Sequence, residues 1–236
     1  MCIRDSTYTQ NWLCRKLFNQ INLLNSLKKH RPQHEKFIDD QCEKISVFQE
    51  KIATAEAKHI KAVADQIRAW EGNAGKAYFE TLSGVLPRHY QFSGRSFRPA
   101  ADPFNAFLNY AYGMLYSKVE KSLILAGLDP FVGFLHRDDY NYKSLVYDFI
   151  EPYRVFAEKV VFTLFSGKKV RQDHYDEITG GVKLNKEGKV LLVEAFNRYF
   201  EEERVRYLGK NQLRTNIIQT DAHRLANELI GKSEAE

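Results

Sequence analysis

The 236-residue sequence has few cysteines and prolines and no long hydrophobic run. Its three cysteines (Cys2, Cys14 and Cys42) form no CxxC pair and are too scattered for a disulfide framework, which favours a reducing, cytoplasmic setting. The longest uncharged run with good apolar content, 103–117, is shorter than the roughly 20 residues that a membrane-spanning helix needs. These absences exclude a disulfide-stapled scaffold and leave no membrane span.

Apolar residues recur at steps of three and four, which predicts helices over most of the chain. The expected helices cover about 8–29, 35–70, 71–82, 103–126, 144–165, 190–205 and 211–230. Asp102 before Pro103 predicts a helix start, Gly127 a helix end, and Pro152 a kink. Short alternation around Gly180-Gly181 predicts a small hairpin over 178–189. We therefore expect a mainly α fold with many helices and at most one small β-hairpin.

Basic residues are concentrated rather than spread evenly. Lysine and arginine exceed aspartate and glutamate by 35 to 30, and the segments 81–101 and 204–220 contain no acidic residue. In the first of these segments Arg88, Arg95 and Arg98 lie among aromatic residues. Arginines interleaved with aromatics can pair with phosphates and stack on bases, which suggests nucleic-acid binding. A solvated basic loop and a basic helix face are the alternative.

The helix expected over 103–126 has two faces of different character. One is a core stripe of Phe104, Leu108, Ala111, Leu115, Val119 and Leu123. The other carries Asn105, Asn109, Tyr112 and Tyr116. Buried amides and hydroxyls need partners, so this second face either lines a site or belongs to an internal hydrogen-bond network. The spacing leaves both open.

Four residues are candidates for metal chemistry. Glu71 opens the block EGNAG, whose small residues Gly72 and Ala74 leave room around its carboxylate, and His136 ends the block GFLH. Asp148 and Glu151, three residues apart, share a helix face. Carboxylates joined by an imidazole would suit Mg²⁺ or Mn²⁺. Taken singly, each residue is better explained by an ordinary structural role: Glu71 as a surface acid, His136 as a core or helix-end histidine, and Asp148 with Glu151 as a solvated helix face.

The order of four sequence blocks favours a metal-binding role for these residues over an ordinary structural one. EGNAGKAYF, FSGRSFRPAADPFNAFLNYAYGMLY, AGLDPFVGFLH and SLVYDFIEPYR follow one another between about Ile52 and Tyr207. Together they resemble the CRISPR-associated integrases, the universal adaptation nuclease family that inserts new spacers into CRISPR arrays.

The resemblance implies a helical catalytic domain that binds Mg²⁺ or Mn²⁺ through Glu71, His136 and Glu151, with Asp148 in support. In the family reaction, the 3′-hydroxyl of a spacer DNA end attacks a phosphodiester at the repeat boundary. The implied partners are double-stranded and branched DNA, a second copy in the full-length protein, and a small CRISPR adaptation protein. The residues expected to contact DNA are Arg88, Arg95, Arg98, Asn109, Tyr116 and Arg154.

The sequence departs from the family pattern in two places. Nothing in residues 1–50 alternates like the β-rich N-terminal domain of the family, so we expect a helical segment over 1–34 at a truncated boundary. A metal-dependent catalytic domain over 35–232 and a disordered tail over 233–236 would follow. The arginine-rich block is also diluted by Ser96, Phe97 and Ala100. Two alternatives stay open: an integrase of self-synthesising mobile elements, and a catalytically inactive DNA-binding fragment.

Overall fold

A computed structural model of the chain describes residues 3–55, 64–134 and 142–232. Within them the helices are α1 (Ile3–Lys28), α2 (Glu35–Ala53), α3 (Ala64–Gly84), α4 (Pro103–Leu125), α5 (Ser144–Phe149), α6 (Arg154–Ser166), α7 (Lys186–Asn197) and α8 (Arg214–Leu229). Strands β1 (Tyr175–Ile178) and β2 (Gly181–Leu184) form one antiparallel hairpin, and β3 (Arg204–Tyr207) and β4 (Lys210–Leu213) form another. The predicted mainly α fold is confirmed.

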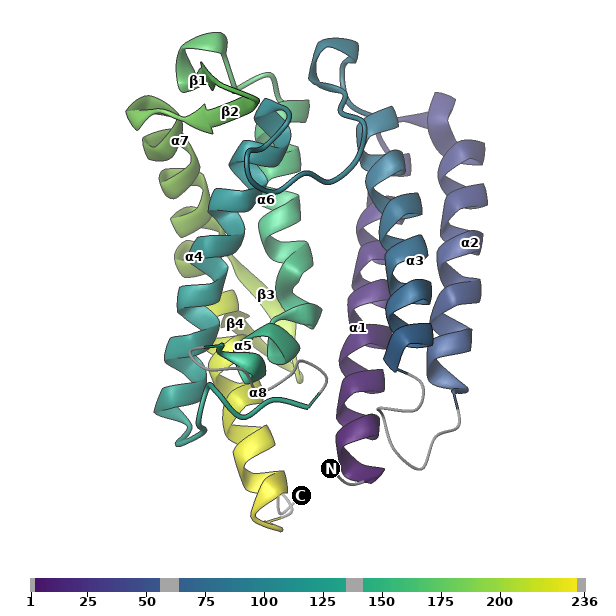
Figure 1. The fold of residues 1–236 in the computed structure, drawn as a ribbon, viewed down its shortest axis with the longest axis vertical. Helices are drawn as coiled ribbons and strands as arrows, with labels where there is room; N and C mark the ends of the chain where they lie inside the picture. The colour runs from purple at the N-terminus through teal and green to yellow at the C-terminus, as the bar shows by residue number, and fades with distance from the viewer. Residues whose placement is uncertain (1–2, 56–63, 135–141, 233–236) are drawn as a thin grey trace.

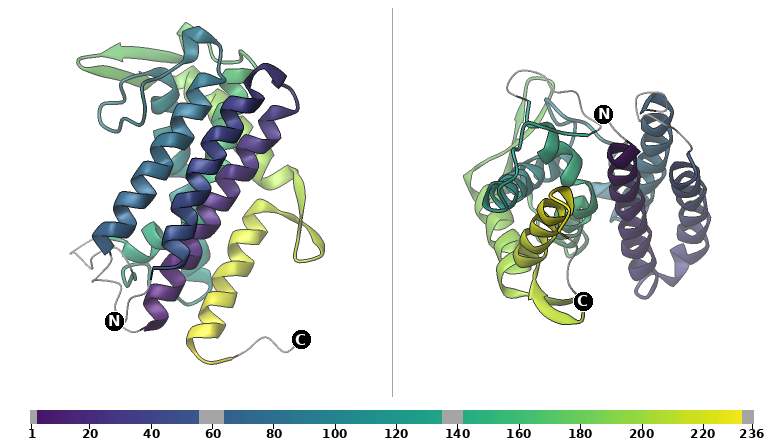
Figure 2. Two further views of the ribbon diagram at one scale, coloured as in Figure 1. Left: turned by 90° about the vertical axis from the view of Figure 1, so that its right-hand side faces the viewer. Right: turned by 90° about the horizontal axis from the view of Figure 1, so that it is seen from below.

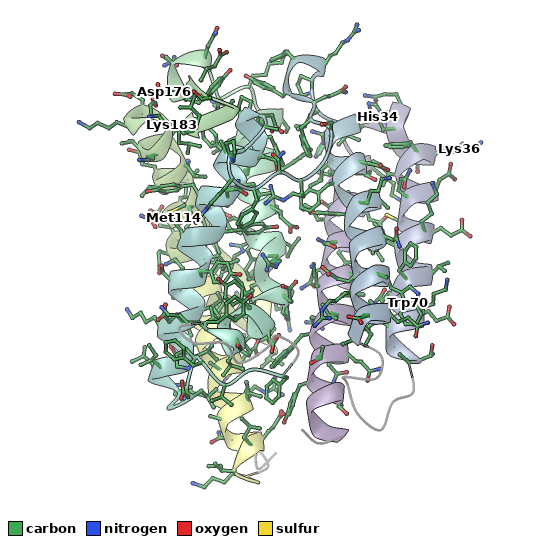
Figure 3. The ribbon with its side chains drawn as sticks, in the orientation of Figure 1. His34, Lys36, Trp70, Met114, Asp176 and Lys183 are labelled. Carbon is green, nitrogen blue, oxygen red and sulfur yellow. The ribbon has the colours of Figure 1, made fainter. Side chains whose placement is uncertain are left out.

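The helices form two groups that share one core. Helices α1, α2 and α3 make an antiparallel three-helix bundle, and α4, α6, α7 and α8 make the second group, which carries both hairpins (Figures 1 and 2). Side chains fill the space between the groups, whereas Lys36 and Lys183 point away from the molecule on opposite sides (Figure 3). The first and last described residues lie at the same end of the molecule (Figure 1).

Helix α4 matches its predicted core stripe and both predicted ends. All six stripe residues are buried. The Asp102 carboxylate accepts a hydrogen bond from the backbone N–H of Asn105 at 2.8 Å, which caps the helix. Gly127 has a φ of +78°, and the N–H of Leu128 reaches back to the carbonyl of Leu123 at 3.0 Å, a glycine-terminated helix end.

Pro152 interrupts the helix predicted over 144–165. Helix α5 ends at Phe149, a 3₁₀ turn covers Glu151–Tyr153, and α6 begins at Arg154. This turn packs against α1, so the proline brings Glu151 to the boundary between the two helix groups.

Two predicted boundaries and the hairpin count need correction. The helix predicted over 35–70 ends at Ala53, and α3 runs without a break through Glu71 to Gly84, because the buried side chains of Ala74, Tyr78 and Leu82 hold it despite two glycines. The helix predicted over 190–205 leaves the α conformation after Asn197, and a second hairpin follows. There are thus two hairpins in the described residues, and the first lies over 175–184, slightly earlier than predicted.

None of the helices in the described ranges is long and apolar enough to cross a membrane. The proposed tail over 233–236 lies outside the described residues.

Candidate functional site

Glu71 and Glu151 converge on one lysine. The Nζ of Lys16, a buried residue of α1, contacts Oε1 of Glu71 on α3 and lies 2.7 Å from Oε2 of Glu151. Oε1 of Glu151 accepts a hydrogen bond from Nε of Arg154 at 2.8 Å. Two carboxylates from separate elements therefore share a single cationic group at the junction of the helix groups.

The electrostatics of this cluster favour its charged state. Burial lowers the pKa of Lys16, but the charges of Glu151 and Glu71 outweigh burial and raise it above its ordinary value. Burial likewise raises the pKa of Glu151, but the neighbouring Arg154 and Lys16 outweigh it and lower the pKa of this carboxyl. The pKa of Arg154 is raised because Glu151 outweighs the effect of burial. Glu151 thus stabilises the charged forms of Lys16 and Arg154, and these two cations stabilise its carboxylate.

Two pockets meet at the paired glutamates. The smaller, of about 220 Å³, is lined by Trp12, Arg68 and Asp148 as well as the glutamates. The larger, of about 510 Å³, extends between α3, the 92–97 loop, α4 and α6. Gly72 and Gly75 line the larger pocket, and a Cβ added at either position would meet no atom within 4 Å. Glycine inside a helix costs about 1 kcal/mol relative to alanine. The space at these two positions lets a ligand approach the backbone of α3. Ala74, in contrast, is fully buried.

Asp148 supports the segment that leads to His136. Its Oδ2 accepts a hydrogen bond from the backbone N–H of Phe134 at 2.5 Å. Gly133 is packed so closely that an added Cβ would lie 2.9 Å from this same oxygen and 2.5 Å from Cβ of Ser144. A side chain at 133 would force the two segments apart. His136 lies outside the described residues.

The carboxylates of Glu71 and Glu151 supply part of the ligand set that a divalent cation needs. No group of three His, Cys, Asp or Glu side chains arranged to hold a metal occurs within residues 3–55, 64–134 and 142–232. The oxygens of Glu71 and Glu151 do share one cation, the Lys16 ammonium, so a second cationic species bound there would have the same two carboxylates available. The histidine that would complete the set falls on a segment that is not described.

A buried polar network extends from this cluster. The hydroxyl of Tyr112 donates to Oε1 of Glu158 at 2.7 Å, in fully buried surroundings. The guanidinium carbons of Arg154 and Arg95 lie 5.0 and 5.5 Å from the centroid of the Tyr112 ring. The second oxygen of Glu158 and the side-chain amide of Gln20 are buried and have no hydrogen-bond partner among the residues that the structure describes, and both residues line the larger pocket. Polar groups left in this state are available to a polar ligand.

The asparagines on the same face of α4 fix the arginine loop. Asn105 accepts from Arg95 and donates to the carbonyl of Gly94 at 2.8 Å. Asn109 accepts from Arg95 at 2.8 Å and donates to the carbonyl of Phe97 at 2.8 Å. The polar-aromatic face therefore forms an internal network and, through Tyr112, also lines a pocket. The internal network is thus present, whereas a role of this face in lining a functional site stays a prediction.

Of the other predicted DNA contacts, Arg88 and Arg98 lie between α3 and α4, and Tyr116 lies on α4. Arg88 and Arg98 are exposed. Tyr116 packs edge-on against Tyr147, with ring centroids 4.8 Å apart, and its ring centroid lies 6.0 Å from the Arg154 guanidinium. These positions leave the predicted DNA contacts untested.

Sequence reasoning missed Lys16, Gln20 and Glu158. Each carried a signal. Lys16 and Gln20 are polar residues on the face of α1 that also carries Leu13, Leu17 and Leu24, and Glu158 follows Glu151 by seven residues, two helical turns. A polar residue at a core position of an amphipathic helix points to a buried network.

The sequence of the chain is similar to those of known proteins. The family model for "CRISPR associated protein Cas1" matches residues 4–198. A CRISPR-associated endonuclease Cas1 of Thermus thermophilus is 34% identical over 171 residues, which cover 71% of this chain and 51% of that protein. A second, from Thermodesulfovibrio yellowstonii, is 29% identical over 208 residues, covering 87% and 64%. The chain spans between half and two thirds of the length of these relatives.

Solved structures share the fold. A casposase bound to integration product has a TM-score of 0.82 and 25% identity, covering 98% of this chain and 62% of the other. A Cas1 protein from Thermotoga maritima has a TM-score of 0.80 and 20% identity, covering 100% and 70%. A Cas6-RT-Cas1–Cas2 complex has a TM-score of 0.80 and 22% identity, covering 99% and 24%.

Proposed function

The chain belongs to the Cas1 family of CRISPR-associated proteins, and from that premise we propose that it is the helical catalytic part of a metal-dependent DNA endonuclease and integrase. The reaction would insert spacer DNA into a CRISPR array by attack of a 3′-hydroxyl on a phosphodiester. The observation that carries the proposal is the convergence of Glu71 and Glu151 on one cation between two pockets.

Glu71, Glu151 and, by the resemblance, His136 would hold Mg²⁺ or Mn²⁺. When bound, such an ion would polarise the scissile phosphodiester and favour deprotonation of the attacking hydroxyl. Asp148 would keep the segment leading to His136 in place through its bond to the Phe134 amide. Arg154 would orient Glu151 through its hydrogen bond to this carboxylate.

The larger pocket suits a DNA backbone. Arg95 and Arg154 line it, and guanidinium groups pair with phosphate oxygens. Gly72 and Gly75 leave space for the strand along α3. Such contacts would position DNA without reading its sequence. We propose further that the protein acts as a dimer with a small Cas2-type partner, and the likeness to a complex that contains Cas2 supports the choice of partner.

The decisive experiment is strand joining and cleavage of a branched DNA with Mn²⁺ or Mg²⁺. Glu71→Gln, Glu151→Gln and His136→Ala are each expected to lower the rate by about two orders of magnitude or more, since even residues that only support metal ligands typically contribute 10–100-fold. Glu50→Gln, at an exposed position of α2, is the matched control. Activity that survives in all three variants would refute the assignment. Salt-dependent DNA binding without metal-dependent turnover would instead select the inactive DNA-binding fragment.

The likeness to a casposase favours a second candidate, an integrase of a mobile element. The same residues would then join the element's ends to a target. Offering one preparation both a CRISPR-repeat target and mobile-element ends separates the two, because each candidate requires preference for its own DNA.

A further inference from the structure

Two buried polar side chains of the larger pocket have no role in the proposed chemistry. Gln20 on α1 and Glu158 on α6 are both fully buried and line this pocket. Oε1 and Nε2 of Gln20 and Oε2 of Glu158 have no hydrogen-bond partner within residues 3–55, 64–134 and 142–232. Unpartnered buried polar atoms cost free energy, so a fold that keeps them side by side has acceptors to offer to a further donor.

The ammonium of Lys16 is a donor within reach of these acceptors. Lys16 and Gln20 are four residues apart on α1, so their side chains lie one above the other on the same face of the helix. Both line the larger pocket, as does Glu158. A lysine side chain has three N–H donors at the end of a flexible four-carbon stem. A change of rotamer can therefore carry Nζ of Lys16 toward Gln20 and Glu158 while α1 stays in place.

Lys16 satisfies the two glutamates unequally. Its ammonium donates a hydrogen bond to Oε1 of Glu71. Oε2 of Glu151 lies 2.7 Å from the same Nζ, yet within the described part of the chain this oxygen accepts no hydrogen bond, so the contact is an ion pair only. A divalent cation has no fixed donor directions and can be shared by both carboxylates. The lysine is therefore a replaceable occupant of the position between them.

The charges of the cluster favour displacement of the lysine by a divalent cation. Lys16 and Arg154 balance Glu71 and Glu151, two positive charges against two negative ones. A divalent cation added at the glutamates, with the ammonium still between them, would bring like charges together where the dielectric constant is low. Transfer of the ammonium to Glu158 removes this repulsion and pairs the lysine with another buried carboxylate.

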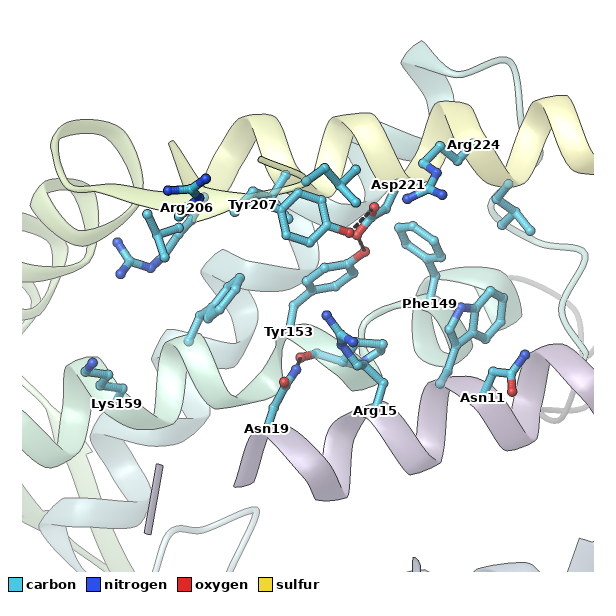
Figure 4. Close-up of a pocket in the computed structure, with 18 of the residues that line it drawn as sticks. Asn11, Arg15, Asn19, Phe149, Tyr153, Lys159, Arg206, Tyr207, Asp221 and Arg224 are labelled. Atoms are coloured by element: carbon cyan, nitrogen blue, oxygen red, sulfur yellow. Dashed lines mark hydrogen bonds between the residues drawn. The ribbon is translucent and has the colours of Figure 1, made fainter. Parts of the chain in front are cut away.

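The backbone that carries Lys16 and Glu151 is held from the other side of α1. The amide of Asn19 donates to the carbonyl of Pro152 at 2.9 Å and ties α1 to the turn of Glu151 (Figure 4). The hydroxyl of Tyr153, in the same turn, donates to the carboxylate of Asp221 on α8 at 2.8 Å (Figure 4). These bonds join the three elements independently of the Lys16 ammonium, so an exchange of its partners is confined to the lysine side chain.

We propose that Lys16 has two positions: its ammonium holds Glu71 and Glu151 together until a divalent cation binds there, and then moves to Gln20 and Glu158. Lys16 is in this role a positioning residue. It keeps two buried carboxylates from repelling each other before the cation arrives, and the two acceptors lower the cost of its displacement. The inference rests on the proposed function for the cation, and on the unpartnered acceptors for the second position of the lysine.

The test measures the Kd for Mn²⁺ without DNA, from the electron paramagnetic resonance signal of the free ion. The acceptor variant is Gln20→Leu with Glu158→Gln. Its Kd should rise about tenfold, the effect expected for loss of a hydrogen bond to a charged group. The control, Gln33→Leu with Glu50→Gln, makes the same changes at exposed positions outside the pocket and should keep the wild-type Kd. Lys16→Met should lower the Kd about tenfold or more, because the uncompensated carboxylates then have no competing cation.

A double-mutant cycle shows whether the acceptors act through the lysine. In a Lys16→Met background no ammonium has to be received, so the acceptor substitutions should leave the Kd for Mn²⁺ unchanged. A rise of the same size in both backgrounds would overturn the proposal, because Gln20 and Glu158 would then act on the cation directly. Equal Kd values for wild type and the acceptor variant would overturn it as well.

A direct readout needs no variant to fold. In crystals of the wild type grown with Mn²⁺, Nζ of Lys16 should lie within hydrogen-bond distance of Gln20 or Glu158, and in crystals grown with EDTA it should lie between the glutamates. A bound Mn²⁺ with the ammonium still between Glu71 and Glu151 would refute the inference and leave the proposed function intact. Failure of wild type and Lys16→Met alike to bind Mn²⁺ would refute the proposed function, and this inference with it.

Discussion

Nζ of Lys16 lies 2.7 Å from Oε2 of Glu151, and this ion pair joins the first helix to the turn that starts α6. Because the same ammonium contacts Glu71, it connects α1, α3 and the turn before α6 at one point. A lysine that holds both candidate metal ligands is a competitor of the metal. The free protein is stabilised by Lys16, and a bound divalent cation would take over part of that role.

Replacement of Lys16 by methionine should therefore destabilise the protein most strongly when no metal is present. Removing one partner of a buried ion pair leaves an uncompensated charge and costs about 3–5 kcal/mol. Urea unfolding in EDTA should show a loss of this order, and Mn²⁺ should restore part of it. The control is Lys76→Met, which breaks an exposed contact of 3.9 Å with Glu80 and should cost less than about 0.5 kcal/mol. An equal loss with and without Mn²⁺ would show that the ion does not replace the ammonium.

Acid should weaken the protein through Glu151. The burial of this carboxyl raises its pKa, but Arg154 and Lys16 outweigh burial, so the folded-state pKa lies below the ordinary value of 4.5. A carboxyl with a lowered folded-state pKa contributes stability that is fully present above about pH 4.5 and is lost as the pH falls through the folded-state value.

The urea midpoint of the wild type should accordingly fall more steeply between about pH 5 and pH 3 than that of Glu151→Gln. Glu50→Gln, on the surface of α2, should keep the wild-type slope. Parallel pH profiles for wild type and Glu151→Gln would contradict the assignment of this dependence to Glu151.

Local rules predicted the elements whose causes lie in neighbouring residues. The cap at Asp102, the end at Gly127 and the interruption at Pro152 each follow from the chemistry of one or two adjacent residues, and all three are present. The core stripe of α4 follows from helical spacing alone. The role of Glu71 and Glu151 as metal ligands came from the resemblance to the family, because their spacing alone did not distinguish it from an ordinary structural role.

The features that the sequence did not predict depend on contacts between residues that are distant in the chain. Lys16 is 55 residues from Glu71, and only packing of α1 against α3 brings them together. The bond from the Phe134 amide to Asp148 requires the close approach at Gly133, which no periodicity reveals. The β3–β4 hairpin turns at Leu208-Gly209, and leucine is an unusual residue for such a turn. Parts of both strands were therefore assigned to the helices predicted over 190–205 and 211–230.

Tyr112→Phe should destabilise the fold through Glu158. The tyrosine hydroxyl donates to a fully buried carboxylate whose other oxygen has no hydrogen-bond partner in the described part of the chain. Hydrogen bonds to charged groups contribute about 1.5–3 kcal/mol, so a loss of about 2 kcal/mol is expected in urea unfolding. Tyr110→Phe on the exposed side of α4 should change stability by less than about 0.5 kcal/mol.

A double-mutant cycle separates this bond from other effects of the substitution. In a Glu158→Gln background the charge is gone, and Tyr112→Phe should cost clearly less. Additive losses would mean that Tyr112 acts through packing against Arg95 and Arg154 rather than through Glu158.

Leu208→Asn should stabilise the β3–β4 hairpin. Leu208 and Gly209 have φ angles of +47° and +76°, the left-handed conformation at both central positions of the turn. Asn-Gly is the preferred pair there, whereas a leucine side chain is strained by about 1–2 kcal/mol. Leu208 is 55% exposed, so its removal forfeits little buried apolar surface. Thermal unfolding should show a gain of about 1 kcal/mol. Leu208→Ala, which keeps the unfavourable φ, should give no such gain, and a gain of equal size in both variants would trace the effect to the lost leucine side chain instead of the backbone.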